Sequence, residues 1–121
     1  MGIWKDLKSS DQLRAIIDGS HRKPVVIYKH SSRCGTSFFV RKRLEHDWDF
    51  AVEDIDLYFL DLISYRDLSD EVAQTLGVRH ESPQILVIAD GRSIYDTSHG
   101  GVSVKAIKKA LGSNGNGKDP S

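Results

Sequence analysis

Residues 28–37 read Tyr-Lys-His-Ser-Ser-Arg-Cys-Gly-Thr-Ser and contain Cys34, the single cysteine of the 121-residue chain. The apolar, β-branched run 24–28 just before Cys34 predicts a strand, and residues 38–44 after it predict a helix. Cys34 is therefore expected where a strand passes into a helix. Free N–H groups and the positive end of the helix dipole stabilise a thiolate at such a position, so the sequence predicts a nucleophilic cysteine.

Polar groups around Cys34 support this interpretation. Ser37 lies one helical turn further on, and its hydroxyl can donate a hydrogen bond to the sulfur. Lys29, His30 and Arg33 are expected to add donors or positive charge nearby. A lone cysteine is more often a small buried hydrophobe, but such a cysteine would have apolar neighbours, which this one lacks.

The bulk composition limits the classes of protein. A chain of this length forms one domain, and no stretch approaches the roughly 20 apolar residues of a membrane span. Residues 1–8 are charged where a signal peptide is apolar, so a cytoplasmic protein is expected. Seventeen basic and seventeen acidic residues cancel, which disfavours nucleic acid and membrane partners. The five histidines show no metal-ligand spacing, so no metal site is expected.

Alternation and periodicity predict the order of helices and strands along the chain. We expect helices at 12–17, 38–44, 70–76 and 104–111, the last two closed by Gly77 and Gly112, and strands at 24–30, 55–62, 85–89 and 92–96. Asp90-Gly91 predicts a hairpin, so the last two strands should be antiparallel, whereas the first two should be parallel. Residues 113–121 have no apolar side chain to bury and are expected to form a disordered tail.

Some side chains receive a more specific assignment. Trp4 and Leu7 have helix-like spacing and are assigned to packing. Phe38 and Phe39 are expected on the inner side of their helix, together with Val40 and Leu44. Pro83 is placed at the start of a strand, where proline is tolerated, and its peptide bond is a candidate for the cis form.

The order of elements resembles the thioredoxin-like fold, in which a cysteine faces a cis-proline loop. This resemblance implies an α/β domain over residues 1–112, with a mixed four-stranded sheet of two parallel strands and a C-terminal hairpin, flanked by helices. It also implies that Ser82-Pro83 lies beside Cys34 in space. A dithiol thioredoxin would carry its second cysteine at position 37, so Ser37 makes this motif monothiol.

Three segments, 28–34, 60–69 and 77–84, resemble the YtxJ-type general stress proteins, the monothiol bacilliredoxin family. The resemblance implies a thiol-disulfide oxidoreductase that removes bacillithiol, or a similar low-molecular-weight thiol, from oxidised client proteins. The small thiol would be a co-substrate, with no tightly bound cofactor and no metal. The family's Cys-Pro-Ile-Ser motif appears here as Cys34-Gly35-Thr36-Ser37, which leaves the preferred thiol open.

Three other functions remain open from the sequence. Cys-Gly-Thr-Ser also resembles the motif of glutaredoxin-linked arsenate reductases, although the helical insertion of those enzymes has no counterpart here. Gly100-Gly101 is compatible with an iron–sulfur carrier of the monothiol glutaredoxin type. A stress protein whose cysteine is only capped by a small thiol is the third alternative, and turnover would separate it from an enzyme.

The thioredoxin-like order implies a recognition surface built from three segments, 30–37, 82–84 and 99–101. Loops that converge beside a reactive group commonly form a site. Glycines near the last helix would let its N–H groups approach a carboxylate, such as that of the malate part of bacillithiol. The expected catalytic residues are Cys34 and Ser37, and the expected substrate-binding residues are His30, Arg33, Gly35, Thr36, Ser82, Pro83, Gln84, His99, Gly100 and Gly101.

Overall fold

A computed structural model describes residues 3–114 of the chain. The strands are β1 (Lys5–Asp6), β2 (Val25–His30), β3 (Asp56–Asp61), β4 (Gln84–Ala89) and β5 (Arg92–Ser98). The helices are α1 (Ser10–Gly19), α2 (Gly35–Asp47), α3 (Arg66–Leu76) and α4 (Val104–Asn114), with a 3-10 helix η1 (His99–Gly101) before α4. The predicted alternation of helices and strands is present.

The five strands form one mixed sheet in the order β1-β3-β2-β4-β5. β3 runs parallel to both β1 and β2, whereas β4 is antiparallel to β2 and β5. The mixed sheet is therefore as predicted, except that it has five strands and not four. The extra strand β1 lies between Trp4 and Leu7, where helix-like spacing is misleading because a two-residue strand is too short to show alternation.

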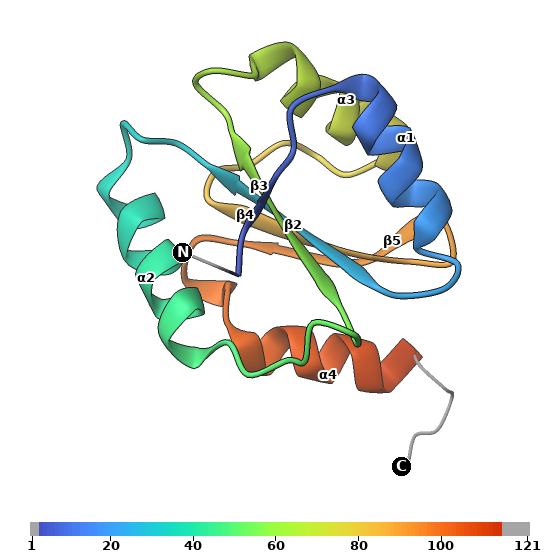
Figure 1. Ribbon diagram of the computed structural model, residues 1–121. Coiled ribbons are helices and arrows are strands. Elements are labelled where there is room, and N and C mark those ends of the chain that lie inside the picture. The colour runs from blue at the N-terminus through green and yellow to red at the C-terminus, as the bar shows by residue number, and fades with distance from the viewer. Residues whose placement is uncertain (1–2, 115–121) are drawn as a thin grey trace.

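Helices cover both faces of the sheet (Figure 1), and the alternation of β2 separates two cores. Val25 and Ile27 belong to the core under α1 and α3. Val26 and Tyr28 belong to the core under α2 and α4. All six residues of β2 are buried, so the strand that leads to Cys34 is the centre of the molecule.

Two helix boundaries differ from the prediction. α3 begins at Arg66 and not at Asp70, because Ser69 is fully buried within the helix and does not act as a cap. α4 continues through Gly112 to Asn114, so the predicted stop at Gly112 is wrong. The rest of the predicted tail, 115–121, lies outside the described residues. Gly77 ends α3 as predicted, in the left-handed conformation with φ 67°.

The hairpin and the proline turn agree with the prediction. Asp90 and Gly91 have positive φ values of 55° and 80° and join the antiparallel strands β4 and β5. The Ser82–Pro83 peptide bond is cis. None of the described helices has the length and apolar character needed to cross a bilayer. Between residues 3 and 114, no cluster of three or more histidine, cysteine or acidic side chains is arranged to hold a metal ion.

Candidate active site

Cys34 is the N-cap residue of α2, at the end of a tight turn that leaves β2. Its N–H donates to the Ser31 carbonyl at 3.0 Å. The Arg33 N–H donates to the Ser31 hydroxyl at 3.3 Å. The thiol is partly exposed. The predicted strand-to-helix position of the cysteine is therefore present, with a fixed turn behind it.

The first turn of α2 lowers the pKa of the Cys34 thiol. The cysteine side chain does not close a capping hydrogen bond of its own, but the N–H groups of the next turn act on the sulfur. The Ser37 N–H contributes most, partial burial of the thiol works against it, and the Thr36 N–H and the hydroxyls of Ser37 and Thr36 lower the pKa further. Hydrogen bonds to the anion favour the thiolate, which is the nucleophilic form.

Ser37 is fully buried beneath the cysteine. Its hydroxyl accepts a hydrogen bond from the Ser31 N–H at 3.4 Å, which leaves the hydroxyl proton for the sulfur. The Ser37 carbonyl accepts from the Tyr28 hydroxyl at 2.7 Å. Burial raises the pKa of Tyr28, so its phenol remains a donor. This contact joins β2 to the first turn of α2, and the sequence prediction missed it, although Tyr28 alternates in phase with the buried Val26.

The three predicted recognition segments meet at one edge of the sheet. In the strand register Lys29 pairs with Gln84, and Gln84 pairs with Ser98. The His99 N–H donates to the Pro83 carbonyl at 2.9 Å, and α2 contacts η1. The end of β2, the start of β4 and the end of β5 therefore lie together, as the resemblance implies.

Some of the predicted binding residues face inward. The side chain of Gln84 is 1% exposed; it donates to the Arg79 carbonyl and accepts from the Glu81 N–H, so it supports the loop before β4. His30 is 6% exposed, and burial lowers its pKa. Among the described residues, His30 Nδ1 and Ser82 Oγ are buried polar atoms with no hydrogen-bond partner. Such atoms are rare in folded proteins; His30 is the last residue of β2, and Ser82 lies in the turn before β4.

Other predicted residues face solvent. Arg33, Gly35 and Thr36 are exposed around the cysteine. His99, Gly100 and Gly101 are exposed on η1. The Ala106 N–H at the start of α4 donates to the Ser103 hydroxyl. This N–H group is therefore already satisfied within the chain.

Lys29 does not lie beside the sulfur, so the prediction that it adds charge there is wrong. It alternates with Val25 and Ile27 and points toward α3, on the other face of the sheet from α2. The Lys29 ammonium is fully buried and donates to the Ser69 carbonyl at 3.1 Å and to His80 Nδ1 at 3.2 Å. Burial lowers the pKa of Lys29 to about 8. The pKa of His80 is also lowered, mainly by burial and next by the nearby charge of Lys29. A lowered pKa favours the neutral imidazole, whose Nδ1 can accept the hydrogen bond from Lys29.

Phe38 and Phe39 are not on the inner side of α2, contrary to the prediction. The buried residues of α2 are Ser37, Val40 and Leu44, which follow the i, i+3, i+7 spacing of one helix face. Phe38 is 50% exposed and Phe39 is 73% exposed. Because the inner residue at position 37 is a serine, a prediction from hydrophobicity alone misses this pattern.

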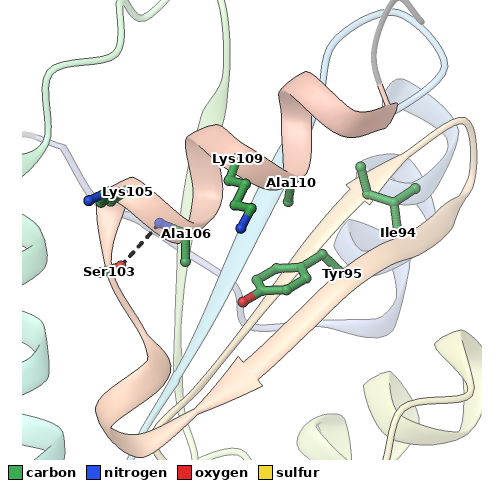
Figure 2. A pocket seen from close by; sticks show the side chains of 7 residues that line it. All are labelled: Ile94, Tyr95, Ser103, Lys105, Ala106, Lys109 and Ala110. Atoms are coloured by element: carbon green, nitrogen blue, oxygen red, sulfur yellow. Dashed lines mark hydrogen bonds between the residues drawn. The ribbon is translucent and has the colours of Figure 1, made fainter. Parts of the chain in front are cut away.

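A groove of about 670 Å³ lies away from the cysteine, between β5 and α4. Figure 2 shows Tyr95 and Lys109 reaching toward each other across it, with Ile94 and Ala110 at one end. None of the predicted site residues lines this groove. This groove is therefore not part of the candidate site around Cys34.

Comparisons with known proteins identify relatives of this arrangement. The family model for the monothiol bacilliredoxin BrxC matches residues 5–107. A solved thioredoxin-fold structure, itself proposed to be an oxidoreductase, shares 31% sequence identity with a TM-score of 0.76 and covers 90% of this chain and 94% of its own. Thioredoxin from Malassezia sympodialis has 19% identity and a TM-score of 0.68, covering 91% of this chain and 88% of its own. Thioredoxin from Trypanosoma brucei brucei has 13% identity and a TM-score of 0.69, covering 88% and 86%.

Proposed function

Because the chain belongs to the monothiol bacilliredoxin family, a group of thioredoxin-fold oxidoreductases, we propose that it removes bacillithiol from oxidised client proteins. The Cys34 thiolate attacks the bacillithiol sulfur of the client's mixed disulfide. A disulfide forms between Cys34 and bacillithiol, and the client cysteine leaves as a thiolate. A second bacillithiol then attacks the bacillithiol sulfur on Cys34, releasing the Cys34 thiolate and the symmetric disulfide of bacillithiol.

One observation carries this proposal: the chain's single cysteine caps α2 with its pKa lowered, and the position of a second thiol is occupied by Ser37. The thiolate can therefore attack, but the protein has no internal thiol to resolve the adduct. An external thiol must complete the cycle, and this requirement supports our proposal that the protein works in the cytoplasm, a compartment rich in reduced small thiols.

The exposed η1 segment is the proposed contact for the small thiol. Gly100 and Gly101 have no side chains to block a ligand, and His99 is held to Pro83 beside the end of β2. His30 and Ser82 lie at the adjoining strand ends with their buried polar atoms. No resident cofactor or metal takes part in this mechanism.

The proposal is tested with a bacillithiolated protein and a substoichiometric amount of this chain. Mass spectrometry should detect bacillithiol on Cys34, and released client thiol should exceed the amount of enzyme when free bacillithiol is supplied. The Cys34→Ser variant should give neither result. The absence of an adduct on wild type, or equal release by Cys34→Ser, would refute the proposal. Release limited to one equivalent of client thiol per enzyme would indicate a stress protein whose cysteine is only capped. A glutathionylated client, assayed in parallel, tests whether bacillithiol is the thiol that the protein prefers.

A further inference from the structure

Two exposed phenylalanines follow the reactive cysteine on the outer surface of α2. The exposed fractions are 50% for Phe38 and 73% for Phe39, and their rings pack edge to face with centroids 5.9 Å apart. Contiguous exposed apolar side chains of this size are typical of an interaction surface.

One cationic side chain lies close to a ring, and two others flank the pair in sequence. Arg33, Lys42 and Arg43 are exposed, and the Lys42 ammonium lies 5.6 Å from the centroid of the Phe38 ring. The Arg43 guanidinium also donates a hydrogen bond to the Val102 carbonyl. We call Arg33, Phe38, Phe39, Lys42 and Arg43 the α2 ridge.

The α2 ridge has a net positive charge. Glu45 is the one acidic residue between positions 31 and 46. Its side chain is 12% exposed, and its carboxylate accepts from Trp4 Nε1 at 2.6 Å and from Arg41 Nε at 3.1 Å. The Lys42 ammonium lies 3.9 Å from the other Glu45 carboxylate oxygen, so Glu45 offsets part of the positive charge. The ridge itself still has three cations and no acid, so it complements a negatively charged partner.

We propose that the α2 ridge docks the chain segment that flanks the client's mixed disulfide, and that it favours segments in which an apolar side chain lies next to acidic ones. This inference rests on the proposed function, because it assigns the partner of the same cysteine. A disulfide that reaches Cys34 brings its flanking backbone over the start of α2. Phe38 and Phe39 lie about 6–8 Å along the helix from the cysteine, the span of two extended residues.

The test compares three disulfides of bacillithiol. Two are short peptides with one bacillithiolated cysteine and a leucine two residues away, flanked by glutamates in one peptide and by lysines in the other. The third joins bacillithiol to free cysteine and has no flanking chain. Wild type should react about tenfold faster with the acidic peptide than with the basic peptide.

Variants of the ridge separate docking from chemistry. The double variant Phe38→Ser/Phe39→Ser should lose about tenfold in rate with the acidic peptide, while its rate with the cysteine disulfide stays within about twofold of wild type. Lys42→Glu should shift the preference toward the basic peptide. Val52→Ser is the matched control, because Val52 is 81% exposed but lies beyond the far end of α2, and its rates should not change.

Equal wild-type rates with the two peptides would overturn the inference. An equal loss of rate for all three disulfides in the phenylalanine variant would do the same. If wild type reacts with none of the disulfides, the proposed function fails, and the ridge is then tested by fluorescence anisotropy of the labelled, reduced peptides with Cys34→Ser. Tighter binding of the acidic peptide, lost in Phe38→Ser/Phe39→Ser, would support the ridge, and indiscriminate or absent binding would reject it.

Discussion

At the scale of single residues, hydrogen bonds from backbone N–H groups and from hydroxyl groups lower the pKa of the Cys34 thiol. Ser37→Ala keeps the Ser37 N–H, which contributes most, and removes the hydroxyl. The thiol pKa should therefore rise but stay below the free value of about 8.5. The rate of alkylation by iodoacetamide as a function of pH measures this midpoint in both proteins.

Thr36→Val is the matched control for this experiment, since it also removes a hydroxyl from the first turn while keeping its N–H. The Thr36 hydroxyl contributes less than that of Ser37, so its loss should raise the pKa by a smaller amount. An unchanged midpoint in Ser37→Ala, or a wild-type midpoint at or above the free value, would contradict the account of activation.

Single residues also show how far the sequence could predict the site. The positions of Cys34 and Ser37 at the start of α2 were predictable, because strand end, helix start and one-turn spacing are local properties. The inward direction of Lys29 was not, because its neighbours Ser69 and His80 are 40 and 51 positions away in sequence. Phe38 and Phe39 were misplaced because hydrophobicity favours burial, whereas these side chains remain exposed beside the reactive cysteine.

At the scale of elements, Lys29 links β2 to α3 and to the loop before β4. Its pKa of about 8 in the folded protein lies below the unfolded value of about 10.4. Between these values the unfolded chain binds more protons, so the stability of wild type should rise with pH across this window. Relative to Lys29→Met, wild type should gain on the order of 3 kcal/mol in unfolding free energy from pH 7 to pH 10.5.

Urea unfolding at a series of pH values gives this difference directly. Lys105→Met serves as the control, because it removes a lysine from an exposed position with the same substitution. A pH-independent difference between wild type and Lys29→Met would mean that the buried ammonium keeps an ordinary pKa.

The η1 segment offers a second test at this scale. A Cβ at position 101 would overlap the hydroxyl of Thr97 on β5, whereas a Cβ at position 100 meets open space. Gly101→Ala should therefore cost about 1 kcal/mol through a displaced Thr97 rotamer, and Gly100→Ala should cost less than about 0.5 kcal/mol.

Thermal unfolding of Gly101→Ala, Thr97→Ala and the double variant Gly101→Ala/Thr97→Ala completes a double-mutant cycle. The double variant should recover most of the loss caused by Gly101→Ala, because the overlapping side chain is gone. Additive losses would show that the contact with Thr97 is not the cause.

The elements whose bounds were predicted well are those with strong local signals. The apolar run of β2 and the Asp90-Gly91 turn are examples. β1 has two residues and is defined by its pairing with β3, which no local pattern reveals. Gly112 did not stop α4, because glycine ends a helix where it adopts the left-handed conformation, and its presence alone does not impose one.

At the scale of the whole molecule, the sheet separates a core that supports the site from one that does not. Leu44, on the inner face of α2, is fully buried, and Leu13 of α1 is 1% exposed in the core on the other face of the sheet. Leu44→Ala and Leu13→Ala should each lose about 3 kcal/mol of stability. Only Leu44→Ala should also slow disulfide exchange, because its cavity loosens the helix that carries Cys34.

Exchange rates measured on fully folded protein, below the unfolding transition of both variants, separate the two effects. Equal slowing in both variants would mean that the rate of disulfide exchange depends on overall stability and not on the packing of α2. No slowing in either would mean that the position of Cys34 is fixed by the turn and by Tyr28 alone.

β2 is buried along its whole length and is paired on both edges. Amide protons in such a strand exchange with deuterium only when the molecule opens globally, whereas those of the two-residue β1 and the exposed η1 exchange through local openings. Cys34 is therefore joined to the segment that should be the last to exchange. Partial opening at the edges of the sheet leaves Cys34 in its turn, so the lowered pKa of its thiol should be lost only with cooperative unfolding of the whole domain.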